Sequence, residues 1–145
     1  MQNLPIELKQ KIILYSEFDK IISLFSEIAH YAYNPEIHTW NFAAINGHID
    51  LVRWLHFNHK EGCTTNDMDL AAKNGHLEIV KFLHFNRKEG CTKRAMDYAA
   101  HNGHLQIVKW LHFNSKEGCT IKAMDWASRN GHIGVVKWLR KKCLL

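Results

Sequence analysis

Apolar residues recur along most of the chain at the spacing of short amphipathic helices. Within residues 92–119, Leu105, Val108 and Leu111 follow one another at intervals of three residues. This spacing places their side chains on one face of a helix, the face that packs against a neighbour. We expect three further residues to widen this apolar face: Ile107, Trp110 and Phe113.

A shorter helix is expected just before this one. Thr92 is suited to the N-cap position, where a side-chain oxygen accepts a hydrogen bond from the first turn. Residues Ala95–Ala100 then form the short helix, and its small alanines allow another helix to approach closely. Asn102-Gly103 predicts the end of this helix, because glycine readily adopts the left-handed conformation that follows a last turn. Residues 92–119 therefore predict one helix–turn–helix unit.

This unit is repeated along the chain. The tripeptide Asn-Gly-His begins at residues 46, 74, 102 and 130, a period of 28, and residues 64–91 match residues 92–119 at 20 of 28 positions. Periodicity of this kind is the sequence signature of a stacked repeat array. The predicted helix pairs are 39–46 with 48–58, 67–74 with 76–86, 94–102 with 104–114, and 122–130 with 132–141.

The predicted fold class is an all-α solenoid. A single helix pair cannot bury so wide an apolar face, whereas a stack buries it because each pair covers its neighbour. We expect two parts in the chain: a helical N-terminal segment over residues 1–38 and four repeats over residues 39–145. The repeats are assigned to residues 39–63, 64–91, 92–119 and 120–145.

The repeat resembles a known family. The residues of Met96–Leu111, Met-Asp-Tyr-Ala-Ala-His-Asn-Gly-His-Leu-Gln-Ile-Val-Lys-Trp-Leu, are similar to the core of the ankyrin repeat, and the resemblance covers residues 39–143. It implies a non-enzymatic scaffold for protein–protein interaction that needs no cofactor. The unit is shorter than the usual ankyrin repeat of about 33 residues, as in variants from amoebae, oomycetes and giant DNA viruses. We therefore expect the hairpin fingers of the family to be reduced or absent.

Positions that differ between repeats are the candidates for recognition, since the constant ones build the stack. The resemblance places the first helix of each unit on the concave, partner-binding side. Tyrosine, tryptophan and arginine are frequent interface anchors, and the row Lys73, His101 and Arg129 suits an acidic partner. The predicted partner-binding residues are Asn66, Lys73, Arg94, His101, Lys122, Arg129, Tyr98 and Trp126.

Residues 1–38 do not follow the repeat, and two interpretations stay open. One is a plain helical cap over the first repeat, which solenoids require. The other rests on the pattern Leu-Pro-Ile-Glu-Leu at residues 4–8, which resembles an F-box. That resemblance implies binding to the Skp-type adaptor of a cullin–RING ubiquitin ligase, with the repeats capturing the substrate. The implied contact residues are Leu4, Pro5, Leu8, Ile12 and Ile21.

Composition and charge narrow the choice of function. The net charge is +5 with neutral histidines and is spread along the chain. Nucleic-acid binding usually needs a denser basic stripe, so this function is kept as a weaker alternative. No apolar run is long enough to cross a bilayer. The first residues lack the features of a secretory signal. We expect an intracellular protein of the cytoplasm, or of the host cytoplasm if it is viral.

The recurrent histidines, cysteines and aspartates are candidates for chemistry. Cys63, Cys91 and Cys119 lie 28 residues apart, but no close Cys-x2-Cys pair suggests zinc, so we expect reduced thiols that fill space at the turn. The histidines are expected to pack or hydrogen-bond between repeats, and the recurrent Asp69, Asp97 and Asp125 to form local hydrogen bonds near helix starts. A monomer is expected, with weak self-association through the C-terminal end as an alternative.

Overall fold

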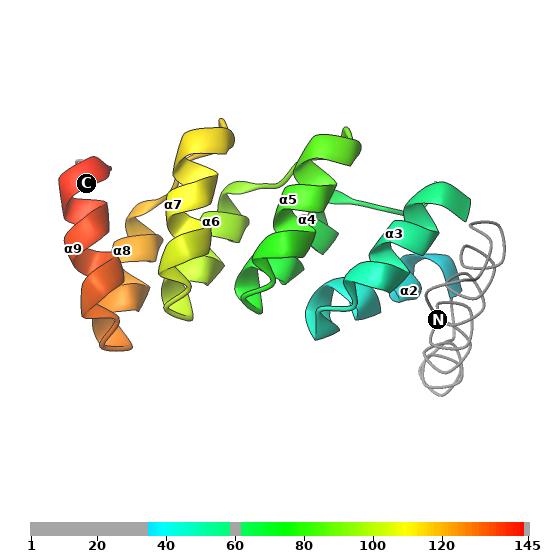
Figure 1. Cartoon of the computed structure of the whole chain (residues 1–145). Helices are drawn as coiled ribbons and strands as arrows, with labels where there is room; N and C mark the ends of the chain where they lie inside the picture. The colour runs from blue at the N-terminus through cyan, green and yellow to red at the C-terminus, as the bar shows by residue number, and fades with distance from the viewer. Residues whose placement is uncertain (1–34, 59–61, 144–145) are drawn as a thin grey trace, which may run out of the picture.

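The computed structural model describes residues 35–58 and 62–143, and these residues form eight α-helices arranged as four successive hairpin pairs (Figure 1). The first helices of the pairs lie in one layer and the second helices in the other. The first helices are α2 (Pro35–Asn46), α4 (Thr65–Lys73), α6 (Lys93–His101) and α8 (Ile121–Arg129). The second helices are α3 (Ile49–Asn58), α5 (Leu77–Asn86), α7 (Leu105–Asn114) and α9 (Ile133–Lys142).

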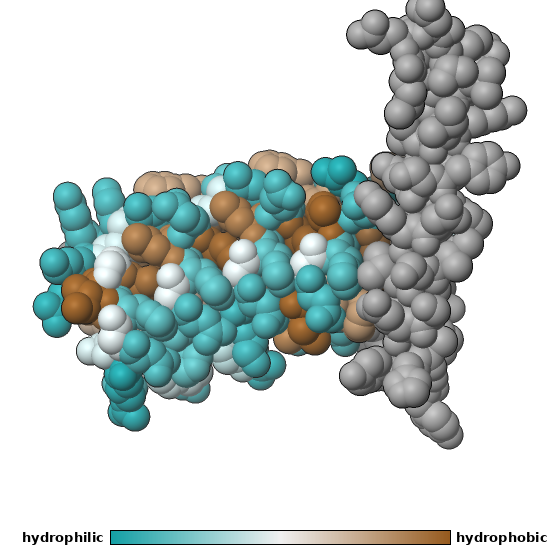
Figure 2. Space-filling view, turned by 60° about the horizontal axis from the view of Figure 1, so that its bottom comes forward, coloured by the Kyte–Doolittle hydropathy of each residue, from teal (hydrophilic) through white to brown (hydrophobic). Residues whose placement is uncertain are grey.

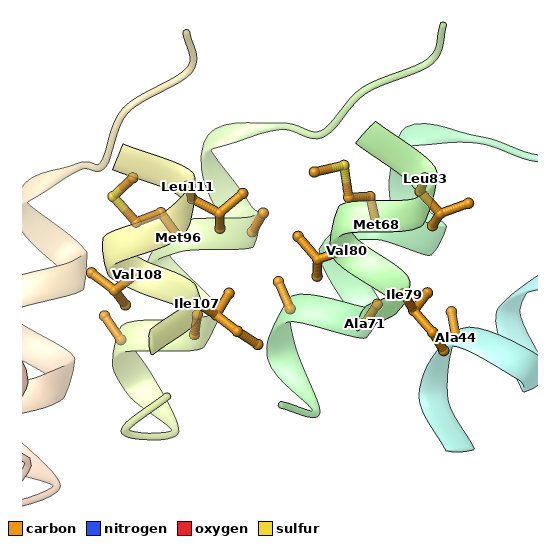
Figure 3. Close-up of a cluster of buried hydrophobic side chains, with 14 of the residues drawn as sticks. Ala44, Met68, Ala71, Ile79, Val80, Leu83, Met96, Ile107, Val108 and Leu111 are labelled. Atoms are coloured by element: carbon orange, nitrogen blue, oxygen red, sulfur yellow. The ribbon is translucent and has the colours of Figure 1, made fainter. Parts of the chain in front are cut away.

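The stack shares one interior. Side chains from both helices of each pair point into the space between neighbouring pairs, as Met68, Val80 and Ile107 do in Figure 3. Ala71 and Ala99 are fully buried, and their small side chains let α4 and α6 pack closely. Contacts between successive first helices are more extensive than those between successive second helices. The first helices therefore form the more tightly packed layer, and the predicted all-α solenoid is confirmed.

Helix ends follow the local signals in the sequence. The Thr92 hydroxyl accepts a hydrogen bond of 3.2 Å from the Arg94 amide, which confirms this threonine as an N-cap. Gly103 has a φ of 78° directly after α6. Helix α2 begins at Pro35 rather than at residue 39, because proline is well tolerated in a first helical turn. The other helix ends lie within two residues of the predicted positions.

The connections between repeats are short. Residues 87–92 and 115–120 join successive pairs without forming a strand. In these two described connections the hairpin finger is absent, as predicted from the 28-residue period. The binding surface of the stack is therefore made by its helices and their turns.

Aspartates link one repeat to the next, which corrects the expectation of purely local hydrogen bonds. The Asp69 carboxylate accepts hydrogen bonds from the Thr92 amide at 2.8 Å and the Thr92 hydroxyl at 2.6 Å. Asp97 accepts the equivalent pair from Thr120, at 2.9 and 2.7 Å. Each aspartate thus holds the N-cap of the following first helix. Asp125 instead pairs with Arg129 in its own helix, at 3.0 Å.

Histidines of the Asn-Gly-His turns provide a second link between repeats. The His76 Nε2 atom lies 2.9 Å from the Ile45 carbonyl oxygen, and His104 Nε2 lies 3.1 Å from that of Lys73. Each ring fills the space beside the glycine of the preceding turn. A Cβ atom on Gly103 would lie 2.6 Å from the His132 Nδ1 atom.

The histidines that precede the recurrent cysteines also pack between repeats. The rings of His56, His84 and His112 lie edge-on to Phe82, Trp110 and Trp138 of the next repeat, with centroids 5.5, 5.1 and 5.0 Å apart. The expected packing of these histidines is confirmed.

Phe113 does not widen the buried face of its helix, contrary to the expectation from the sequence. Its side chain is 69% exposed, whereas Ile107 is buried and Trp110 is half-buried against the core. The reason is geometric. Phe113 follows Leu111 by two residues, and two residues turn an α-helix through about 200°, toward the opposite side.

Candidate binding surface

The predicted partner-binding residues all lie in the layer of first helices. They come from α4, α6 and α8, which follow one another in the stack (Figure 1). Five of them are exposed: Asn66, Lys73, Arg94, Lys122 and Arg129. Three are half-buried: Tyr98, His101 and Trp126.

Five of these residues form one connected set, which we call the aromatic–basic cluster: Lys73, Tyr98, His101, Lys122 and Trp126. The rings of Tyr98 and Trp126 are parallel within 6°, with centroids 6.0 Å apart. The Lys73 ammonium lies 5.5 Å from the Tyr98 ring centroid, and that of Lys122 lies 5.8 Å from the Trp126 centroid. Cations at these distances are attracted to the ring faces. The two rings therefore hold two lysines at the surface.

His101 completes the cluster from the last turn of α6. Its ring packs edge-on against Trp126, with centroids 5.5 Å apart and an interplanar angle of 82°. The Asn130 side-chain amide donates to the His101 carbonyl oxygen at 2.9 Å and lies 3.0 Å from the Nδ1 atom. The same amide group can donate to Nδ1, which places the proton of the neutral imidazole on Nε2. His101 thus presents a hydrogen-bond donor beside the two aromatic rings.

The other three predicted residues lie apart from the cluster. The Asn66 amide donates to the Asn41 side-chain oxygen at 3.2 Å. Arg94 is exposed near the start of α6. Arg129 pairs with Asp125, and their side chains are 75% and 46% exposed. Sequence reasoning had placed Asp125 among the helix-start residues and missed this pair, although the four-residue spacing of opposite charges is a known helical signal.

Two buried acids lie in the same layer of first helices. Burial raises the pKa of Asp67 to about 6, although a hydrogen bond of 2.7 Å from the Thr64 amide opposes the shift. Burial also raises the pKa of Asp69. Lys73 and Lys122 are the exposed charged side chains of the cluster.

The cysteines lack the character of nucleophiles. Burial raises the pKa of the Cys63 thiol to about 12. The pKa of Cys119 is also raised to about 12, first by burial and then by the neighbouring Cys143. A thiol nucleophile reacts as the thiolate, and both thiols are protonated at neutral pH. Cys63 is buried and Cys91 and Cys119 are half-buried, in keeping with small residues that fill the turn.

Three further points concern metal binding, membrane-spanning helices and the F-box-like residues. Within the described ranges, no three histidine, cysteine or acidic side chains are grouped so that they could hold a metal ion. No helix in these ranges is long and apolar enough to pass through a bilayer. The F-box-like residues Leu4, Pro5, Leu8, Ile12 and Ile21 lie outside the residues that the structure describes, and their role stays a prediction.

The surface of the stack mixes polar and apolar areas. Figure 2 shows hydrophobic residues as an interrupted band along one face, with hydrophilic residues on both sides of it. A mixed surface of this kind suits partners that combine apolar and charged groups.

Comparison with known proteins gives one positive result. A family model described as ankyrin repeats, in three copies, matches residues 40–125 and 68–143. The two matches together cover all four helix pairs. No curated protein was found to match the chain.

Proposed function

Because the chain belongs to the ankyrin-repeat family of protein-interaction modules, we propose that its aromatic–basic cluster binds an acidic segment of a partner protein. The observation that carries this proposal is the connected set of contacts from Lys73 through Tyr98 and Trp126 to Lys122. It joins side chains of three successive first helices, α4, α6 and α8.

The chemistry of the cluster supports this partner class. Half-buried tyrosine and tryptophan give a large contact area at a small cost in conformational freedom, which is why they often dominate binding energy. Lys73 and Lys122 are exposed beside them, so a carboxylate of the partner can approach a cation while an apolar side chain covers a ring. The ring contacts hold the lysines in place before binding, which lowers the entropy lost on association.

Affinity capture with charge variants tests this proposal. The double variant Lys73→Glu, Lys122→Glu reverses both exposed charges of the cluster, and truncating a central contact typically costs about 2 kcal/mol of binding energy. The control is Lys88→Glu, Lys116→Glu, which makes the same charge change at exposed positions in the connections between repeats. We expect the cluster variant to lose partners that the wild type and the control retain. Retention of the same proteins by all three would show that the cluster is not the binding site.

The F-box resemblance of residues 1–38 supports a second, more specific candidate, a substrate adaptor of a cullin–RING ubiquitin ligase. In that case a purified Skp-type adaptor would bind the full-length chain, and Leu8→Asp with Ile12→Asp would abolish the complex while the repeats stay folded. If the adaptor fails to bind the folded wild-type protein, residues 1–38 act as a cap alone. That result would leave the proposal for the aromatic–basic cluster intact.

A further inference from the structure

Three phenylalanines occupy the same place in successive repeats and remain exposed. Phe57, Phe85 and Phe113 lie near the C-terminal ends of α3, α5 and α7, and their side chains are 71%, 71% and 69% exposed. A single exposed apolar side chain is ordinary, but several in register form a patch that indicates binding. This patch belongs to the layer of second helices, opposite the aromatic–basic cluster (Figure 1).

The rings are held in place by their neighbours. Phe85 packs edge-on against His84 and against Trp110 of the next repeat, with centroids 5.1 and 6.0 Å apart. Phe113 makes the same contact with Trp138, at 6.4 Å. Edge contacts of this kind are favourable for aromatic pairs. The phenylalanines are therefore positioned before any partner binds, and most of their surface remains free.

Basic residues accompany the phenylalanines. Arg53, Lys81 and Lys109 precede Phe57, Phe85 and Phe113 by four residues and so lie one turn away on the same face of each helix. None of these three basic residues forms an ion pair with another residue in the described part of the chain. In α9 the two equivalent positions are Lys137 and Lys141.

The second helices carry few acidic side chains. Over α3, α5, α7 and α9 these are Asp50 and Glu78, and α9 has four basic residues and no acidic one. The positive charge of this layer thus increases toward the C-terminal end of the stack. An acidic ligand complements it, and complementary charge raises the rate of association.

The spacing of the row fits a polypeptide. Packed helices lie about 8–10 Å apart, so successive phenylalanines repeat at roughly that interval along the stack. Seven residues of an α-helix rise about 10.5 Å, and three residues of a polyproline II chain, which has three residues per turn, rise about 9 Å. A segment with apolar side chains at either interval can cover the three rings in register. Each repeat contributes one phenylalanine to the row, and so narrow a row matches a polypeptide segment better than the flat surface of a bilayer.

We propose that the phenylalanine–basic row, made of Arg53, Phe57, Lys81, Phe85, Lys109 and Phe113, binds an acidic amphipathic segment of a second protein. The row and the aromatic–basic cluster lie in different layers of the stack. The protein is then a two-sided scaffold that holds two partners at once. This proposal stands independently of the cluster, because the two surfaces share no residue.

Fluorescence anisotropy with designed peptides tests the row. The probes are two labelled glutamate-rich peptides of about 21 residues, one with leucine at every seventh position for a helix and one with leucine at every third position for a polyproline II chain. A peptide of the same composition with scrambled leucines is the negative control. We expect one designed peptide to bind the wild-type protein, and to bind it more weakly as the salt concentration rises.

Two variants locate the binding. Phe57→Ser, Phe85→Ser, Phe113→Ser removes the rings, and Arg53→Glu, Lys81→Glu, Lys109→Glu reverses the charges. Each should weaken binding at least about tenfold. Lys88→Glu, Lys116→Glu, which alters exposed residues in the connections between repeats, should leave it unchanged. Circular dichroism and thermal unfolding check that the substitutions keep the fold.

Several outcomes would overturn the proposal. One is that neither designed peptide binds the folded protein, and another is that the scrambled peptide binds equally well. A third is that both row variants bind like the wild type. Binding to phosphatidylserine-containing vesicles or to an oligothymidine, with neither designed peptide bound, would instead assign the row to an anionic membrane or a nucleic acid.

Discussion

At the scale of single residues, the glycine that follows a first helix can serve two purposes. It adopts a left-handed backbone conformation, and it can leave room for a histidine of the next repeat. Gly103 and Gly131 have φ values of 78° and 74°, so both adopt the left-handed conformation. Only Gly103 also lies against a histidine of the next repeat, whereas nothing lies within 4 Å of the Cβ position of Gly131. A side chain at Gly131 would therefore cause backbone strain alone, whereas a side chain at Gly103 would cause backbone strain and a steric overlap with the histidine.

This difference can be measured by substituting each glycine with alanine. Gly131→Ala should lower the free energy of unfolding by about 1–2 kcal/mol, the cost of a left-handed non-glycine residue. Gly103→Ala should lower it by about 1–3 kcal/mol more, because its methyl group would overlap the His132 ring. Urea unfolding of both variants provides the comparison. Equal losses would mean that the His132 ring moves aside freely.

Asp67 gives the fold a dependence on pH. Its pKa is about 6 in the folded chain, against 3.8 for an ordinary aspartate. Between these values the folded chain binds more protons than the unfolded chain, so the free energy of unfolding decreases as the pH rises through this window. The buried Asp67 Oδ1 atom has no hydrogen-bond partner, which is consistent with a carboxylate that is poorly stabilised when ionised.

Asp67→Asn removes this ionisation and should make the variant less sensitive to pH. From about pH 4 to about pH 7, the stability of the variant relative to the wild type should rise by about 1–3 kcal/mol. Asp69 and His104 also have shifted pKa values, but they are present in both proteins and cancel in the difference. Parallel stability curves for the two proteins would contradict a raised pKa of Asp67.

Single residues in the sequence predicted those structural features, such as helix caps and helix ends, that depend on near neighbours along the chain. Thr92 as an N-cap and Gly103 as a helix end follow from their own backbone requirements. The partner of Asp69 could not be predicted in this way, because Thr92 lies 23 residues away and meets it only through the stacking of repeats. The exposure of Phe113 was not predicted, because a list of apolar residues does not include the angular position of each side chain around the helix.

At the scale of helices, the aspartate–threonine links fix how one first helix is placed against the next. The Thr120 hydroxyl donates to Asp97 and accepts from the Lys122 amide, so one side chain connects α6 to the first turn of α8. Asp97 is buried, and a buried carboxylate is tolerated when donors surround it. The link therefore contributes both to the cap and to the interface between repeats.

A matched pair of substitutions tests the link. Asp97→Ala should lower the free energy of unfolding by about 2–4 kcal/mol, since it removes two charge-assisted hydrogen bonds and leaves the Thr120 amide without its acceptor. Asp125→Ala, at the same position of the last repeat, should cost less than about 1 kcal/mol because its ion pair with Arg129 is exposed. Thermal and urea unfolding measure both. A similar loss in the two variants would show that the link adds no stability.

Helix positions were predicted well because each unit repeats the same signals. The exception is α2, whose first turn includes Pro35. The first helix was expected to begin at residue 39, but proline lacks only an amide that a first turn leaves unpaired in any case, so the helix can begin at Pro35.

At the scale of the whole molecule, the two layers of the stack carry different surfaces. Comparing repeats identified Tyr98, Trp126 and Lys73 as candidates, because these positions vary while the core stays constant. It missed the phenylalanine–basic row, because Phe57, Phe85 and Phe113 are identical and identity was taken as a sign of structure. Exposure, which only the three-dimensional arrangement provides, separates the two kinds of constant position.

The links between neighbouring repeats also bear on how the chain reaches its native state. The hydrogen bonds that join repeats connect residues 23–31 positions apart, and the main helix contacts join adjacent pairs. Contacts this close along the chain give a low contact order, which is associated with rapid folding. A folded helix pair provides a surface against which the neighbouring pair can fold, so folding can begin at any repeat and propagate along the array.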